Sequence, residues 1–116
     1  MTVLIVDDHP SFRGSARAML EADGFTVVGE AETGEAALEA AHRLRPDVVL
    51  LDVQLPDRSG FDVCSDLLRL NGQSPEVVLV SSRDACDYGG LIASCGARGF
   101  VPKAELSGEA VSALVG

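Results

Sequence analysis

The stretch Val48-Val49-Leu50-Leu51-Asp52 decides the fold, together with Leu55-Pro56-Asp57-Arg58-Ser59-Gly60 behind it. Four apolar residues in a row, without a polar alternation, are typical of a parallel strand that is covered on both faces. Asp52 ends this strand, and a loop containing proline and glycine follows it. We therefore expect the Asp52 carboxylate to be exposed and rigidly held at the carboxyl end of a buried strand.

Other apolar runs in the chain end in polar groups in the same way. Run 3–6 ends in Asp7-Asp8, run 77–80 in Ser81-Ser82, and run 99–101, through Pro102, in Lys103. Three carboxylates at one edge repel each other, so the pKa of at least one is raised unless a cation is present. Oxygen ligands suit Mg²⁺, and an ammonium group suits a phosphoryl group. The strand ends therefore predict a site for a divalent metal and a phosphoryl group.

Composition limits the classes of protein to which the chain can belong. Its 116 residues suit one domain, 1–116, and 47% of them are apolar. The net charge is −9, with 18 acidic residues against 9 Lys and Arg, which argues against nucleic-acid binding by this domain itself. A DNA-binding domain elsewhere in a longer parent protein remains open.

Location is predicted from the apolar runs and the cysteines. No run approaches the roughly 20 apolar residues of a membrane span, and Met1 leads into a strand without a signal peptide. The three cysteines, Cys64, Cys86 and Cys95, fit no metal spacing and are expected to be reduced thiols on helices. These features predict a cytoplasmic protein that contacts no membrane.

Apolar runs and helical segments alternate along the whole chain. Strands are expected at about 3–6, 25–29, 47–52, 76–81 and 98–102, and helices at 11–23, 34–44, 60–70, 84–95 and 106–115. Thr33 is the predicted N-cap of the second helix. The third helix is expected to break at Asn71-Gly72. The fourth helix is expected to bury Leu91, Ile92 and Cys95. Gly89-Gly90 weaken this helix by about 1 kcal/mol per glycine relative to Ala. Five βα units predict a doubly wound α/β domain, with its ligand at the carboxyl ends of the strands.

The positions Asp7-Asp8, Asp52, Ser81 and Lys103 give the chain a family resemblance. It resembles the response-regulator receiver domain of two-component signalling, with a matching Leu-Pro-x-x-x-Gly loop after Asp52. The resemblance implies a flavodoxin-like, five-stranded parallel sheet in the order 2-1-3-4-5. The stretch 96–103 is similar to the LuxR/NarL-type branch, whose output is a helix-turn-helix. Ala104 stands where many receivers have a proline, as is common in that branch, which removes one source of rigidity from the loop.

The resemblance implies a metal and a phosphoryl acceptor. Asp8 and Asp52 would bind Mg²⁺, or Mn²⁺, directly, with the Gln54 backbone carbonyl as third ligand and Asp7 acting mainly through water. Asp52 would accept a phosphoryl group from a sensor histidine kinase, a phosphotransfer protein or a small phosphodonor, and Lys103 would neutralise charge. Such a domain is a phosphoacceptor that assists its own phosphorylation and dephosphorylation, not an enzyme with a separate substrate.

The resemblance also implies a switch. The Ser81 hydroxyl would move toward the phosphoryl group, and Phe100 would rotate into the vacated space. The face of the fourth helix and fifth strand, including Tyr88, would then be presented to a partner, with a transcriptional output and a possible homodimer. From its apolar strand alone, Phe100 would be an ordinary core residue.

Alternative classes fit the residues less well. A haloacid-dehalogenase-type phosphatase needs a second acid at the position of Gln54, and a dinucleotide-binding domain needs a glycine-rich turn where this chain has Asp7-Asp8. A receiver-like module that binds partners without phosphorylation remains open. Gly60 is expected to supply backbone freedom in its loop. His9 and His42 lack partner ligands at metal spacing and are expected to face solvent.

Overall fold

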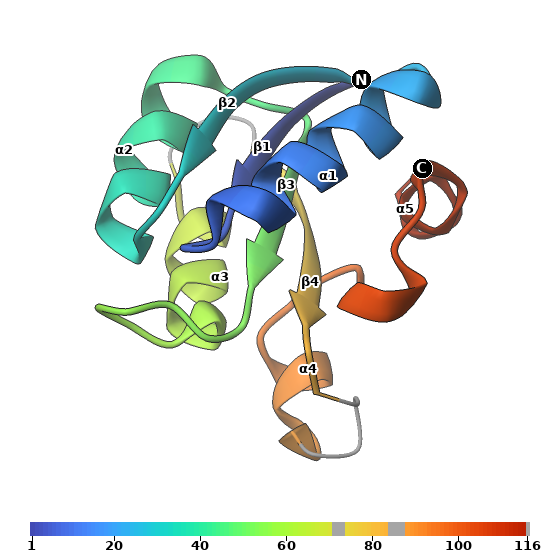
Figure 1. Ribbon diagram of the computed structural model, residues 1–116. Helices are drawn as coiled ribbons and strands as arrows, with labels where there is room; N and C mark the ends of the chain where they lie inside the picture. The colour runs from blue at the N-terminus through green and yellow to red at the C-terminus, as the bar shows by residue number, and fades with distance from the viewer. Residues whose placement is uncertain (71–73, 84–87, 116) are drawn as a thin grey trace.

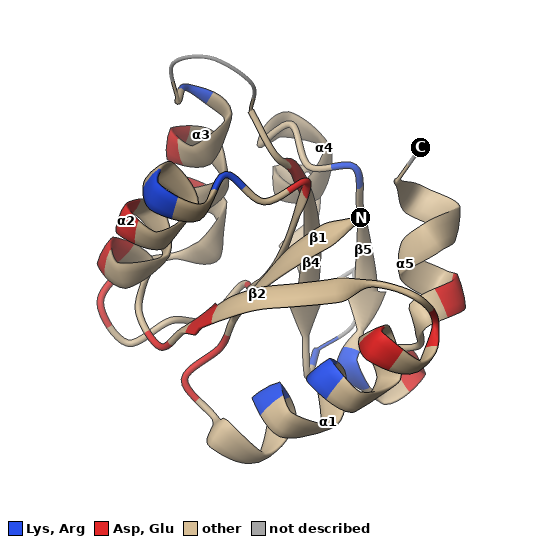
Figure 2. Ribbon diagram, turned by 90° about the horizontal axis from the view of Figure 1, so that it is seen from above, with Lys and Arg blue, Asp and Glu red and all other residues tan. Residues whose placement is uncertain are grey.

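Five parallel strands form the central sheet, in the order β2-β1-β3-β4-β5 (Figure 1 labels the first four of these and Figure 2 labels β5). They are β1 (Thr2–Val6), β2 (Thr26–Ala31), β3 (Val48–Asp52), β4 (Glu76–Ser81) and β5 (Gly99–Pro102). The structure is a computed structural model that describes residues 1–70, 74–83 and 88–115. The predicted flavodoxin-like α/β fold and its strand order are confirmed.

Helices cover both faces of the sheet because successive strand residues point to opposite sides. The helices are α1 (Pro10–Ala22), α2 (Gly34–Leu44), α3 (Gly60–Leu68), α4 (Leu91–Ser94) and α5 (Gly108–Leu114), with a 3-10 turn, η2 (Lys103–Glu105). Val3 and Ile5 belong to the core beneath α1 and α5. Leu4 and Val6 belong to the core shared with α2 and α3. The uninterrupted apolar runs thus supply two core layers at once.

The strand register brings the predicted site residues to one edge of the sheet. Asp52 lies beside Val80, the residue before Ser81. Ser81 pairs with Pro102, directly before Lys103. On the other side, Val6 pairs with Leu51, so that Asp7 follows β1 next to the end of β3. The edge formed by these strand ends therefore carries the acids, the hydroxyl and the lysine together.

Local signals explain where most helices begin and end. The Thr33 hydroxyl accepts a hydrogen bond from the Ala36 N–H at 3.0 Å, which confirms the predicted N-cap of α2. Pro10 stands in the first turn of α1, where its missing N–H costs nothing. The last helix begins at Gly108, later than predicted, because η2 occupies 103–105 and the Ser107 hydroxyl caps the helix.

The fourth helix differs most from its prediction. Within the described residues it is a single turn, Leu91–Ser94, and residues 84–87, including Cys86, lie outside them. Leu91 is 52% exposed, so its predicted burial is wrong. Ile92 and Cys95 are half-buried against the core beneath α2 and α3. One turn lays only part of its surface on a sheet, and Gly89, at φ +57°, precedes it.

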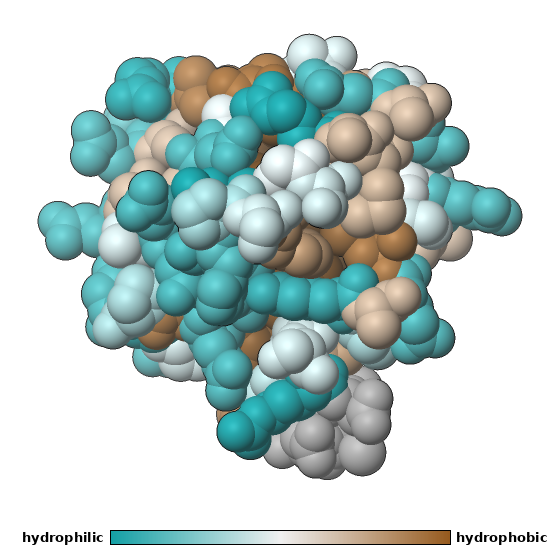
Figure 3. Space-filling model, in the orientation of Figure 1, coloured by the Kyte–Doolittle hydropathy of each residue, from teal (hydrophilic) through white to brown (hydrophobic). Residues whose placement is uncertain are grey.

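Several remaining predictions concern the surface and the thiols. Cys64 is a buried free thiol of α3 and Cys95 a half-buried one, while the predicted break at Asn71-Gly72 lies outside the described residues. No described helix has the length and apolar character of a membrane-spanning segment. Lys and Arg residues are spread over several elements (Figure 2). On the face in Figure 3, apolar and hydrophilic side chains are interspersed.

Candidate functional site

A pocket of about 280 Å³ opens at the carboxyl edge of the sheet. Its lining comes from the ends of β1, β3, β4 and β5: Asp8, His9, Asp52, Gln54, Leu55, Pro56, Ser82 and Lys103. Four predicted site residues thus line one pocket. The hydroxyl side chain in this lining is that of Ser82 rather than that of the predicted Ser81.

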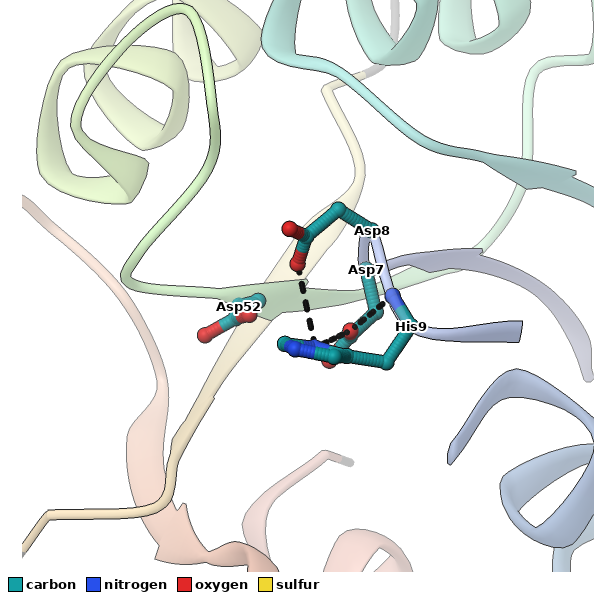
Figure 4. A group of neighbouring side chains, drawn as sticks. All are labelled: Asp7, Asp8, His9 and Asp52. Carbon is teal, nitrogen blue, oxygen red and sulfur yellow. Dashed lines mark hydrogen bonds and ion pairs between the residues drawn. The ribbon is translucent and has the colours of Figure 1, made fainter. Parts of the chain in front are cut away.

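Acidic side chains from the ends of β1 and β3 lie close together at this edge of the sheet (Figure 4). One ligand atom from each of Asp7, Asp8, His9 and Asp52 lies within 4.8 Å of the others. Asp7 is buried, and the Asp52 side chain is only 4% exposed. The expectation of an exposed Asp52 is therefore wrong. The chain around the strand end encloses most of the carboxylate, which is also part of the pocket lining.

Backbone contacts after β3 fix the Asp52 carboxylate. The Gln54 N–H donates to Asp52 Oδ1 at 3.1 Å, and the Gly60 N–H donates to the Val53 carbonyl at 2.7 Å. A Cβ atom on Gly60 would lie 2.3 Å from the Asp52 carbonyl oxygen. Gly60 is therefore required for close approach of two backbone segments. Gly60 is structurally required, but the predicted reason, backbone freedom, is wrong, because the requirement is the absence of a Cβ atom.

A buried arginine holds the segment after β1. Arg13 donates from Nη1 to the Asp7 carbonyl at 2.6 Å and from Nε to Glu30 Oε1 at 2.9 Å. Asp7 Oδ1 accepts the His9 N–H at 2.8 Å. The carbonyl of Asp7 is thus tied to α1 and, through Arg13, to β2, while its side chain binds the His9 backbone before α1.

Lys103 extends into the acidic group from the end of β5. Its Nζ lies 2.5 Å from Asp7 Oδ2 and 3.4 Å from Asp52 Oδ2. The same ammonium group lies 4.4 Å from the centre of the Phe12 ring, which adds a cation–π contact. Lys103 therefore contacts both buried carboxylates.

The pKa shifts of Asp7 and Asp52 indicate that the Lys103 ammonium only partly neutralises the negative charge of this acidic group. Burial raises the pKa of Asp52 to about 6, and the nearby charge of Asp7 adds to this rise. Burial also disfavours ionisation of Asp7, but the Lys103 ammonium beside it and hydrogen bonds to His9 outweigh burial and lower the pKa of Asp7. Among the described residues, Asp7 Oδ2 accepts no hydrogen bond of regular geometry, despite its ion pair with Lys103. An oxygen-rich group with excess negative charge fits a hard divalent cation.

Ser81 is fully buried at the end of β4, and its hydroxyl contacts another hydroxyl. Ser81 Oγ lies 2.5 Å from the Tyr88 hydroxyl oxygen and accepts the Arg83 N–H at 3.1 Å. The Tyr88 ring lies against Phe100, with centroids 5.8 Å apart. The predicted pair of Ser81 and Phe100 is thus joined by an intervening tyrosine.

Sequence reasoning missed the contacts of His9 and Tyr88. His9 Nδ1 lies 2.9 Å from Asp7 Oδ1 and 3.1 Å from Asp8 Oδ1, so the statement that it lacks partner ligands is wrong. Its position directly after the acidic pair was the available signal. His9 and His42 are both exposed, as predicted. Tyr88 is seven residues beyond Ser81, and no sequence pattern indicates that their hydroxyls meet.

Fold and site together define a known class. The family model described as the response regulator receiver domain matches residues 3–114. The chain belongs to this family, which confirms the resemblance identified from the strand ends.

Particular relatives agree with this assignment. The response regulator GacA of Pseudomonas viridiflava is 37% identical over 113 residues, which are 97% of this chain and 52% of GacA. The DNA-binding transcriptional activator EvgA of Escherichia coli K12 is 32% identical over 98% of this chain and 55% of EvgA. The chain thus spans about half the length of these relatives. The solved receiver domain of NarL from Mycobacterium tuberculosis has a TM-score of 0.84 and 33% identity, covering 97% of this chain and 94% of that one.

Proposed function

We propose that residues 1–116 act as one phosphoacceptor domain in which Asp52 receives the phosphoryl group. The observation that carries this proposal is the enclosed Asp52 carboxylate, open to a pocket and 3.4 Å from the Lys103 ammonium. An Asp52 oxygen attacks phosphorus and forms an acyl phosphate, while the bond from phosphorus to the donor breaks. The donor is a phosphohistidine on a sensor kinase or phosphotransfer protein, or a small acyl phosphate.

Mg²⁺ or Mn²⁺ is the proposed metal, held by Asp8, Asp52 and the Gln54 backbone carbonyl, with Asp7 acting through water. The support is the acidic group itself, whose excess negative charge a divalent cation relieves. When bound, the metal supplies charge neutralisation on the phosphoryl oxygens.

The side chains of this chain prepare the acceptor. With a pKa of about 6, Asp52 is mostly ionised near pH 7 and remains a competent nucleophile. Lys103 binds the incoming phosphoryl oxygens after it loosens its ion pair with Asp7. The Gln54 N–H holds Asp52 Oδ1, and Oδ2, which faces the Lys103 ammonium at 3.4 Å, is the oxygen proposed to attack. Since the metal and Lys103 would neutralise charge, the remaining role of the protein is to position the reacting groups.

The proposed output is transcriptional and uses the face of α4 and β5. EvgA carries the name of a DNA-binding transcriptional activator, and this chain matches only about half of it. The charge of −9 supports an output through a further domain or partner rather than through nucleic-acid binding here. Movement of Ser81 and Phe100 after phosphorylation would alter this face, and homodimerisation is one way to transmit the change.

Intact mass spectrometry tests the acceptor. Incubation with a small acyl phosphate and Mg²⁺ should add the mass of one phosphoryl group to the wild-type chain. Asp52→Asn should abolish the gain, whereas Asp62→Asn, an exposed acid on α3, should retain it. Labelling of Asp52→Asn would show that another residue is the acceptor. No gain in the wild type would leave the phosphorylation-independent module as the function.

Thermal unfolding tests the metal separately. At a metal concentration ten times the Kd, binding stabilises the native state by about 1.4 kcal/mol. Asp8→Ala should lose this gain, and its metal-free form should be as stable as the wild type or more so, because one repulsive charge is removed. If Asp8→Ala keeps the full metal-dependent rise in Tm, the proposed ligand set is wrong.

A further inference from the structure

Tyr88 occupies a position that the reaction proposed above does not use. It is the only tyrosine in a chain without tryptophan. Its hydroxyl oxygen lies 2.5 Å from Ser81 Oγ, and Ser81 is fully buried. This part-buried contact between two hydroxyl groups favours one rotamer of each side chain, because each would otherwise lose a hydrogen-bond partner.

Aromatic packing sets the position of the tyrosine ring. The ring meets Phe61 of α3 edge to face, with centroids 5.4 Å apart and planes at 66°. On β5 it meets Phe100, with centroids 5.8 Å apart. Because neighbours from two elements hold the ring, the hydroxyl is directed at Ser81 by packing rather than by the hydrogen bond alone.

The contact competes with the movement required of Ser81. A serine hydroxyl has one hydrogen to donate, and Ser81 Oγ already accepts the Arg83 N–H at 3.1 Å. Ser82, rather than Ser81, lines the pocket with Asp52 and Lys103. Because Ser81 does not line this pocket, its side chain must turn from Tyr88 toward Asp52 before it can bind a phosphoryl oxygen there.

We propose that Tyr88 is a positioning residue that acts through Ser81, holding the Ser81 hydroxyl away from the acceptor site until a phosphoryl group draws it in. This inference rests on the proposed phosphorylation of Asp52. Release of Ser81 leaves the Tyr88 hydroxyl without its partner, and the ring then shifts against Phe100. Tyr88 thereby couples the acceptor site to the surface of β5 and the adjoining α4.

Tyr88→Phe is the sharpest test, because it removes the hydroxyl and keeps the ring. With a small acyl phosphate and Mg²⁺, its initial rate of mass gain should exceed that of the wild type by roughly two- to tenfold, the range expected for loss of one hydrogen bond. A rate equal to or below that of the wild type would overturn the proposal.

The Ser81→Ala background separates positioning from packing. If Tyr88 acts through Ser81, adding Tyr88→Phe to Ser81→Ala should change the rate by less than 1.5-fold, or about 0.2 kcal/mol. A merely structural role would give Tyr88→Phe the same effect in both backgrounds, and that result would overturn the inference.

Tyrosine emission reports the contact without any turnover. Since Tyr88 is the sole tyrosine, emission from the unmodified chain should change on Ser81→Ala. It should also change when the wild type is phosphorylated, but not in Asp52→Asn given the same phosphodonor. A wild-type chain that gains no mass overturns the proposed function. A chain that gains mass, with emission unaffected by Ser81→Ala, overturns only the role of Tyr88.

Discussion

The helices on the two sides of the pocket differ in how firmly they are held. α3 buries Gly60, Val63, Cys64 and Leu67, and the N-terminus of α2 is capped by Thr33 and Asp57. α4 buries none of its four residues, and Gly90 at its start provides no side-chain cap. Elements with little buried apolar area open at low free-energy cost. The proposed acceptor, Asp52, therefore lies on the well-packed side of the pocket. The α4 side is the one that can change conformation when Asp52 is phosphorylated.

Truncating one leucine in α3 and one in α4 tests whether the two helices differ in how much they stabilise the fold. Leu67→Ala, at a fully buried position in α3, should lower the free energy of unfolding by about 3 kcal/mol, within the usual range of 2–5. Leu91→Ala, at a 52% exposed position in α4, should change it by less than about 0.5 kcal/mol. Urea denaturation of both variants measures the difference. Equal losses would mean that α4 is packed as firmly as α3.

The sequence predicted the firmly held side well and the other side poorly. Apolar runs and their polar ends suffice to predict the strands, and hence that Asp7, Asp52 and Lys103 meet, because parallel strands end at one edge. The length of α4 and the exposure of Leu91 were not predictable, since the glycines before it weaken the local helical preference. Contacts such as Ser81–Tyr88 and His9–Asp8 depend on side-chain packing, which periodicity does not encode.

Two glycines provide the second test of the comparison. In Gly60→Ala the new methyl group meets the Asp52 and Val53 backbone, so stability should fall by roughly 2 kcal/mol. Gly90, at φ −80°, has no atom of the described residues within 4 Å of a Cβ position. Gly90→Ala should therefore be neutral or stabilise by about 0.5 kcal/mol, through a less flexible unfolded chain. A harmless Gly60→Ala would show that the segment after β3 adapts as easily as the one before α4.

The carboxylate that caps α2 gives a smaller effect that depends on pH. Hydrogen bonds from the Gly34 and Glu35 N–H groups lower the pKa of Asp57 from its ordinary value of 3.8. Because the pKa of Asp57 is lowered in the folded chain, the carboxylate stabilises the fold fully at pH values above the ordinary pKa of 3.8. This stabilisation is lost as the pH falls through the folded pKa. Asp57→Ala should thus lower the Tm at pH 7, and the difference should be smaller at pH 2, about two units below the ordinary value. The same Tm difference at both pH values would exclude the ionised cap as its cause.

Amide hydrogen exchange, followed by mass spectrometry, tests the central claim most directly. The unmodified chain is compared with the chain bound to Mg²⁺ and a stable phosphoryl mimic such as beryllofluoride. We predict a change in exchange within residues 88–102, which contain Tyr88, α4 and β5, while α2 and the buried part of α3 keep their protection. Unchanged exchange in 88–102, or an equal change on both sides of the pocket, would contradict a phosphoacceptor that is fixed on one side and switches on the other.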